Sequence, residues 1–313
     1  MNKHQKLLIA ITTIIILTAV LATALYSQQN KTDNDKLKIV TTFFPLTFFA
    51  QQIGGDEVTV QQLIPDNTEV HNWQPSFTDI LALDETDVII YNGASLDYWF
   101  EDEIIPIIDS NNKIIVETTK GIDLLETEQE DENHEHDGLY DPHSWINPFI
   151  AEQQAQNIYE ALIQKDPDNM DYYTDRWQKL KTRFKELDNN YLSELSTKRK
   201  DKIFVAHSAF GYLADRYGFE QHGVIGISAD EQPSAPIYAN IVEMMLEHET
   251  FMLYVDPVYA DKPAQTLKNE LERLSGQDVQ ILKLYVMLGE MDGLDYFGQQ
   301  EKNLENLKTG LEA

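Results

Sequence analysis

The feature that most constrains this chain is a long stretch, residues 170–200, that contains neither glycine nor proline. Its apolar residues recur with a period close to 3.6, which is typical of an amphipathic helix: Tyr173, Trp177, Leu180, Phe184, Leu187, Tyr191 and Leu195. Such a helix would be ~40 Å long, enough to cross a whole domain. The fold must therefore be built along one rigid helix, which limits hinge bending compared with flexible linkers.

Strands alternating with helices are predicted on both sides of this long helix. Before it, the predicted strands cover residues 37–45, 58–65, 88–93 and 114–119. After it, the predicted strands cover residues 203–208, 223–228, 251–257 and 279–285, with helices at 237–249 and 263–276. This alternation indicates βαβ units and parallel sheets. The predicted fold class is α/β, with two lobes that each hold a mainly parallel sheet flanked by helices, joined by the long helix.

The N-terminus reads as a targeting segment. Charged residues in MNKHQK precede residues 7–26, which carry no charge. This pattern is typical of a signal peptide, with small residues at Ala22 and Ala24, and the apolar run also has the ~20 residues that a membrane anchor needs. The predicted organisation is a targeting segment 1–26, a linker 27–36, an N-terminal lobe 37–168, a linking helix 169–199 and a C-terminal lobe 200–313. We expect the chain beyond the targeting segment to lie outside the cytoplasm, either secreted or anchored to the outer face of the membrane.

Composition excludes several classes of function. Acidic residues outnumber basic ones 53 to 24, and the formal charge of −29 disfavours nucleic acid as a partner. Because the chain has no cysteine, it offers no disulfide, no thiolate metal site and no lipid anchor on a cysteine. A transition-metal site would have to use imidazole and carboxylate groups. We expect a monomer.

Three of the eight histidines are candidate metal ligands. His71 comes after the strand at 58–65, His207 ends the strand at 203–208, and His143 lies in the proline-framed sequence YDPHSWINP. Ligands of open α/β sheets bind beyond the carboxyl ends of the strands. Imidazoles gathered there suit zinc, copper or nickel better than magnesium or calcium. The alternative for each is a hydrogen-bonded structural histidine.

Four motifs, in order, carry a family resemblance: LIPDNTEVHNWQPSFTDI, YDPHSWINP, IFVAHSAFGYLADRYGFEQHGVIGISADEQPS and YFGQQEKNLENLK. Together they resemble the solute-binding proteins of zinc and manganese ABC transporters, the TroA-like cluster A-I group, over residues 38–311. The resemblance implies a metal in the cleft between two lobes, with His71, His143 and His207 as the first three ligands. It also favours zinc, because the third ligand is histidine in zinc-type members and commonly glutamate in manganese-type members.

The chain departs from this family at the fourth ligand. Many members have Leu-Asp-Pro-Leu or Leu-Asn-Pro-Leu after the last strand, whereas this chain has LKLYVMLGEMDG, in which Lys283 would repel a cation. Glu290, Glu69 and a water molecule are the candidates. A water is compatible with zinc, which often has three protein ligands and one open position. Asp141 or a backbone carbonyl could accept the remaining N–H of a ligand imidazole.

An acidic loop at residues 124–138, LLETEQEDENHEHDG, precedes the second ligand motif. It resembles the His- and acid-rich loops of many zinc-binding members. His134 and His136 would then collect zinc near the cleft. The alternative is a solvated loop, because the segment has few apolar residues to pack.

The predicted function is that of a binding protein rather than an enzyme. It would capture extracellular Zn²⁺ as a transported ligand and deliver it to a membrane permease, whose cytoplasmic ATPase is another chain because no P-loop motif is present. The alternatives are a manganese-binding protein of the same family and a secreted zinc hydrolase, although the HExxH and GxSxG motifs are absent. With imidazole pKa values of about 6.5, zinc binding should weaken steeply between about pH 7 and pH 5.

Overall fold

A computed structural model gives the structure of the chain over most of its length. The described residues are 36–126, 140–227, 233–259 and 262–313, together with Gln5, Thr12, Thr13, Ile16 and Thr18. The chain divides into two units, Met1–Leu37 and Lys38–Ala313. Most of the predicted targeting segment, residues 1–26, lies outside the described residues. Among the residues that are described, no helix has both the length and the apolar character to cross a bilayer.

The N-terminal half of the second unit is built on a four-stranded sheet with the strand order β2-β1-β3-β4. The strands are β1 (Leu37–Thr41), β2 (Val58–Gln62), β3 (Val88–Tyr91) and β4 (Ile114–Glu117). β3 pairs in parallel with both β1 and β4. All four β3 side chains are buried, as expected for a central strand that is covered on both faces. The short helix α3 (Phe77–Ala82) begins with the capping box that Ser76 and Asp79 form.

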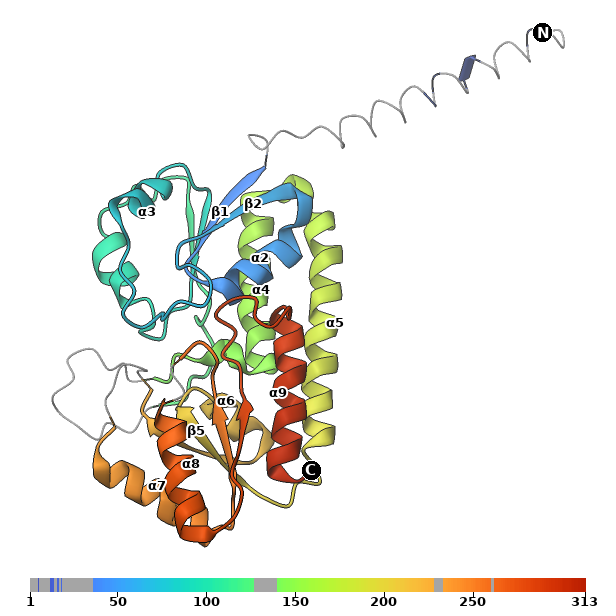
Figure 1. Cartoon of the computed structure of the whole chain (residues 1–313). Helices are drawn as coiled ribbons and strands as arrows, with labels where there is room; N and C mark the ends of the chain where they lie inside the picture. Colours follow the sequence, from blue (N-terminus) through green and yellow to red (C-terminus); the bar gives the residue numbers. More distant parts are fainter. Residues whose placement is uncertain are drawn as a thin grey trace. The chain divides into compact units, whose positions relative to one another are not determined.

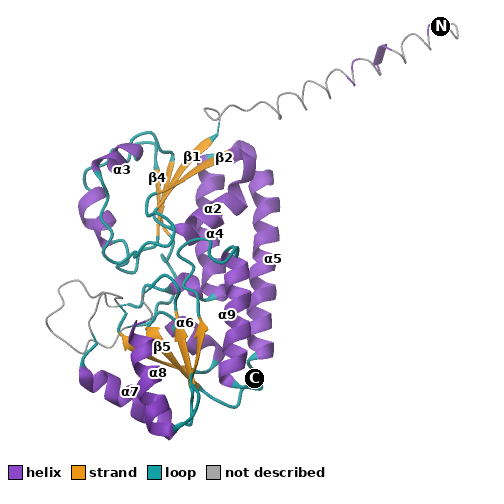
Figure 2. Cartoon of the chain, viewed as in Figure 1, coloured by secondary structure: helices purple, strands orange, loops and turns teal. Residues whose placement is uncertain are grey.

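The C-terminal half repeats the plan with the strand order β6-β5-β7-β8. Its strands are β5 (Lys202–His207), β6 (Glu220–Ile225), β7 (Met252–Val255) and β8 (Gln280–Lys283), and the three neighbouring pairs are parallel. The helices of this half are α6 (Gly211–Tyr217), α7 (Ala235–Glu247), α8 (Lys262–Ser275) and α9 (Tyr296–Leu311). The two four-stranded sheets are drawn in orange in Figure 2.

One long helix, α5 (Met170–Glu194), runs beside both halves. Figure 1 shows it next to α4 (Pro148–Lys165) along the first half and next to α9 along the second. The 25 residues of α5 correspond to ~38 Å. One side of the helix is buried through six apolar residues of the predicted stripe: Tyr173, Trp177, Leu180, Phe184, Leu187 and Tyr191. The predicted α/β class, with two sheets and one long helix, is confirmed.

Several boundaries differ from the sequence prediction, and three of them have an identifiable cause. The first strand ends at Thr41 rather than at residue 45, because Pro45 in the first turn helps to begin helix α2 (Phe44–Gly54). β6 begins three residues earlier than predicted, at Glu220, because an edge strand tolerates polar residues that hide its pattern. α5 ends at Glu194. The Ser196 hydroxyl donates a hydrogen bond to the Ser193 carbonyl, and this bond competes with the main-chain hydrogen bonds that would extend the helix.

Candidate metal centre

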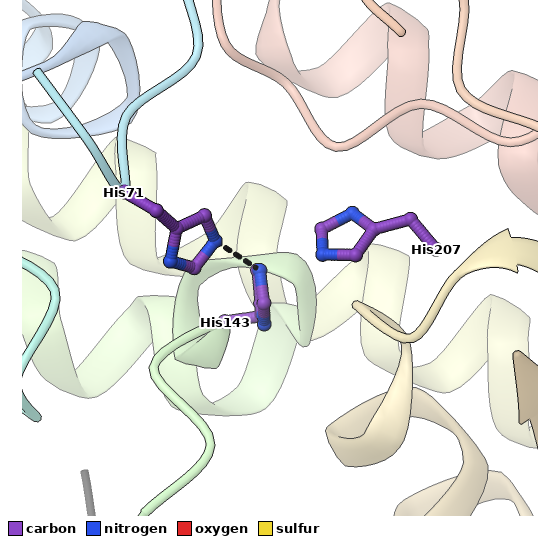
Figure 3. A group of neighbouring side chains, drawn as sticks. All are labelled: His71, His143 and His207. Atoms are coloured by element: carbon purple, nitrogen blue, oxygen red, sulfur yellow. Dashed lines mark hydrogen bonds between the residues drawn. The ribbon is translucent and has the colours of Figure 1, made fainter. Parts of the chain in front are cut away.

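Three histidines from separate parts of the chain come together between the two halves. His71 lies in a turn after β2, His143 immediately precedes the short 3₁₀ helix η4 (Ser144–Ile146), and His207 is the last residue of β5. One ring nitrogen from each can be chosen so that all three lie within 4.8 Å of one another. Figure 3 shows the three imidazoles facing a common point. Within the described part of the chain, no other group of histidine and acidic side chains is gathered this closely.

The closest nitrogen pair already has the spacing of metal ligands. Nε2 of His71 and Nε2 of His143 are 3.2 Å apart. Two nitrogens on one tetrahedral zinc at ~2.0–2.1 Å lie about 3.3 Å from each other. The ring centroid of His207 is 5.0 Å from that of His143 and 6.0 Å from that of His71. Small shifts of the His207 ring would therefore complete a three-nitrogen site.

Asp141 fixes the orientation of the His143 ring. One carboxylate oxygen, Oδ1, accepts hydrogen bonds from both the main-chain N–H and the Nδ1 of His143, at 2.9 and 2.8 Å. When Asp141 is ionised, Nδ1 carries the hydrogen and Nε2 presents its lone pair to the site. His143 is only 1% exposed, which leaves its ring little freedom to turn. The pair has the carboxylate–histidine arrangement that supports metal ligands.

The two ring nitrogens of His207 differ in their hydrogen bonding. Its Nε2 is 2.6 Å from the Ile227 carbonyl, and its Nδ1 is buried with no hydrogen-bond partner among the described residues. A buried ring nitrogen without a partner costs about 1–3 kcal/mol, which only a cation bound through that nitrogen, Nδ1, would recover. A metal bound through Nε2 would replace the bond to Ile227.

Burial keeps the three imidazoles neutral. Desolvation lowers the pKa values of His143 and His207 to about 3, and lowers the pKa of His71 well below its usual value. Desolvation also raises the pKa of Asp141 to about 7, against the main-chain hydrogen bond from His143 and the electrostatic effect of His207, which both lower it. With a dication bound to His143, the Asp141 carboxyl group would be charged, because the nearby positive charge stabilises the carboxylate. The site therefore combines neutral nitrogen ligands with a buried acid behind them.

Hydrogen bonds from both halves hold the segment that carries His143. Asn92, which follows β3, donates its Nδ2 to the Pro142 carbonyl at 3.1 Å. From the other half, the Tyr212 hydroxyl donates to the Asp141 carbonyl at 2.6 Å. The indole N–H of Trp145 in turn donates to the Val286 carbonyl at 2.7 Å. Sequence reasoning did not single out Asn92 or Tyr212; Tyr212 lies in the His207 motif, but that motif gave no sign of its hydroxyl contact.

The remaining predicted site residues lie elsewhere. Glu290 is exposed and outside the group of three histidines, and its carbonyl accepts a hydrogen bond from Asn67. Glu69 accepts the main-chain N–H of His71 at 2.8 Å, which positions that ligand loop. Lys283 is exposed and paired with Asp292. His134 and His136, with most of the acidic loop, lie outside the described residues.

Comparison with known proteins identifies the family. The family model described as "Zinc-uptake complex component A periplasmic" matches residues 39–310. The chain belongs to this family. It is 31% identical over 292 residues to the "High-affinity zinc uptake system protein ZnuA" of Bacillus subtilis, covering 88% of each chain. It is 30% identical over 294 residues to the "Zinc-binding lipoprotein AdcA" of Streptococcus pneumoniae, covering 90% of this chain but only 57% of that relative.

A solved structure from this zinc-uptake family has the same fold. The Zn(II)-bound ZnuA-like domain of Streptococcus pneumoniae AdcA superposes with a TM-score of 0.73 at 26% identity, covering 89% of this chain and 100% of that domain. The match confirms the two-lobe architecture expected from the resemblance.

Proposed function

We propose that this chain captures Zn²⁺ outside the cytoplasm and delivers it to a membrane permease for uptake. The observation that carries the proposal is the group of three neutral imidazoles, two buried and one half-buried, with two nitrogens 3.2 Å apart. Three nitrogen ligands and a water or carboxylate oxygen make a good tetrahedral zinc site and a poor site for the harder manganese ion. Zinc is the cargo, and the permease and its ATPase are other chains.

Several properties of the chain support a carrier rather than a hydrolase. His143 and His207 are 1% and 3% exposed, so an ion among the imidazoles would be largely enclosed by protein. A hydrolytic zinc needs an open position that a substrate can reach. The family description, a component of a zinc-uptake complex, is that of a transport protein.

Removing single imidazoles tests the proposal. We expect His71→Ala, His143→Ala and His207→Ala each to weaken zinc binding by roughly 100-fold or more, because loss of a ligand should exceed the 10–100-fold cost of losing an outer-shell partner. His248→Ala is the matched control, because His248 is an exposed histidine at the end of α7. Zinc affinity is measured by competition with a chromophoric chelator, with manganese as a second ion.

Two results would refute the function. One is a wild-type protein that fails to take zinc from the chelator. The other is a set of ligand variants that bind zinc as tightly as His248→Ala. Tighter binding of manganese than of zinc would reassign the cargo.

A further inference from the structure

The segment that ends β5 and begins α6 touches the metal centre twice. His207 is the last residue of β5, and Tyr212 is the second residue of α6, five positions later. His207 supplies a ring nitrogen to the centre, whereas Tyr212 reaches the main chain two residues before His143. This short stretch of chain thus contains one ligand, His207, and bonds the segment that carries another, His143, 64 positions earlier in the sequence.

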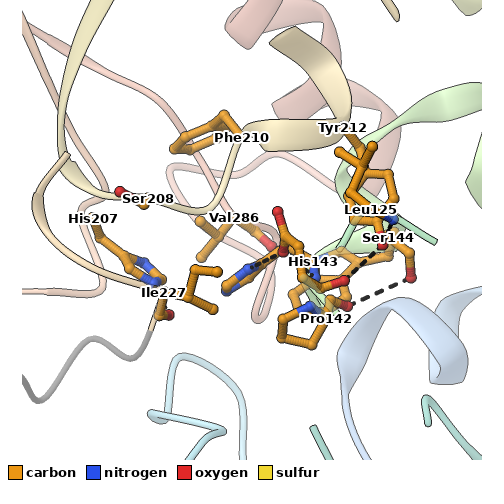
Figure 4. Close-up of polar contacts among 12 residues, drawn as sticks. Leu125, Pro142, His143, Ser144, His207, Ser208, Phe210, Tyr212, Ile227 and Val286 are labelled. Atoms are coloured by element: carbon orange, nitrogen blue, oxygen red, sulfur yellow. Dashed lines mark hydrogen bonds and ion pairs between the residues drawn. The ribbon is translucent and has the colours of Figure 1, made fainter. Parts of the chain in front are cut away.

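The Tyr212 hydroxyl links helix α6 to the main chain at Asp141 and at Leu125. It donates to the Asp141 carbonyl at 2.6 Å and accepts from the Leu125 N–H at 3.2 Å. The N–H of Asp141 donates in turn to the Leu125 carbonyl at 2.9 Å. Figure 4 shows Tyr212 beside Leu125, next to the His143 segment. Since Tyr212 is only 3% exposed, water does not readily replace these bonds.

Two further contacts tie α6 to the same segment. The Tyr212 carbonyl accepts the Nδ2 of Asn147, the residue that caps α4, at 2.6 Å. Gly211 leaves room for the Asp141 side chain, because a Cβ at that position would lie 2.6 Å from Oδ2. Tyr212 therefore holds the main chain of Asp141 at the place where its carboxylate can orient His143.

We propose that Tyr212 is a positioning residue of the metal centre, whose hydroxyl fixes His143 relative to His207 by holding the Asp141 main chain. Without the hydroxyl, the Asp141 carbonyl and the Leu125 N–H would both lose a buried partner. The Asp141 carboxylate would then shift, and with it the His143 imidazole. This inference rests on the proposed zinc-binding function and assigns to it a residue that is not itself a ligand.

The test compares Tyr212→Phe with Tyr217→Phe. Tyr217 lies on the same short helix, is 5% exposed, and donates its hydroxyl to Asp188 at 2.9 Å, away from the three histidines. Both variants lose one buried hydroxyl, so a general effect on stability should be similar for the two. We measure zinc affinity by chelator competition, the visible absorption spectrum of the Co²⁺-loaded protein, and the urea midpoint of the metal-free protein.

We expect Tyr212→Phe to weaken zinc binding about tenfold or more, the range found for groups that orient metal ligands. Its Co²⁺ spectrum should also change, because the ligand geometry changes. Tyr217→Phe should keep the wild-type spectrum and an affinity within about threefold. Incorporation of 4-aminophenylalanine at position 212 restores an N–H donor and should restore affinity, which provides a second route to the answer if Tyr212→Phe does not fold.

The inference is overturned if wild-type protein binds zinc and Tyr212→Phe matches it in affinity and Co²⁺ spectrum. It is also overturned if the 4-aminophenylalanine variant folds but binds zinc more weakly than Tyr217→Phe. Wild-type protein that binds no zinc would instead refute the proposed function, and this inference with it.

Discussion

At the scale of single residues, burial decides the protonation of the metal centre. An imidazole with an ordinary pKa of about 6.5 loses about 30-fold in metal affinity at pH 5, so three such groups would lose roughly 10⁴-fold. The steep loss predicted from the sequence between pH 7 and pH 5 rested on that value. Burial lowers the pKa values of His143 and His207 to about 3, which overturns the premise.

We therefore expect zinc affinity to fall by no more than about 50-fold between pH 7 and pH 5, the limit set by one buried acid with a pKa of about 7. The folded imidazoles stay neutral over this range, and the remaining loss comes from Asp141, whose pKa of about 7 lets it take up a proton and support His143 less well. Isothermal titration at several pH values measures the effect. A loss approaching 10⁴-fold would mean that the imidazoles titrate as exposed groups do.

The same pKa shifts affect folding, so the titrations need a check on the fold. Below about pH 6.5 the imidazoles of the unfolded chain take up protons, whereas the buried imidazoles of the folded chain do not. The metal-free protein therefore loses stability as the pH falls from about 6.5 to about 3. Asp141 acts in the opposite direction, because its raised pKa favours the folded state at lower pH. Circular dichroism at each pH shows whether the protein is folded where its affinity is measured.

At the scale of elements, the acidic loop is separable from the three-histidine centre. Its two ends are joined by an isolated antiparallel bridge between Glu126 and Tyr140. Deleting residues 127–137 would leave Gly138 and Leu139 between the bridged residues, which is the length of a two-residue hairpin connection. The contacts of Tyr212 with Leu125 and Asp141 would be retained.

We expect this deletion to change the affinity of the tightest zinc site less than about threefold, whereas His207→Ala changes it by roughly 100-fold or more. If His134 and His136 collect zinc, the deletion variant should bind fewer weakly held zinc ions per chain than the wild-type protein at high zinc concentration. Calorimetry on the two variants separates the tight and weak sites. Equal losses of tight binding in both would place the main site in the loop.

Among the elements, helix ends that carry a capping signal were predictable, whereas the ends of two strands were not. The capping residues Ser76 and Asp79 start α3 as their spacing predicts, and Gly276, with a φ of 68°, follows α8 as expected for a C-terminal glycine. The ends of β1 and β6 depended on Pro45 and on edge pairing. Both are effects of context that a local pattern does not contain.

At the scale of the whole molecule, the two sheets explain how much of the site could be predicted. Within each sheet the carboxyl ends of parallel strands meet at one edge, so the histidines that follow β2 and end β5 were expected at ligand-binding edges. The bonds that hold them were not predictable, because they join main-chain groups such as Pro142 and Val286 to side chains far away in the sequence. Such contacts leave no periodic signal. A fourth protein ligand likewise has no signature in this chain.

Crystallography of the zinc-soaked protein with anomalous data at the zinc absorption edge tests the central claim most directly. We predict one dominant anomalous peak, ~2.0–2.1 Å from one ring nitrogen each of His71, His143 and His207. The density around it will also show whether Glu290, Glu69 or water supplies the fourth ligand. A zinc-loaded crystal with no peak among these three histidines, or with its strongest peak elsewhere, would contradict the assignment of this centre as the zinc site.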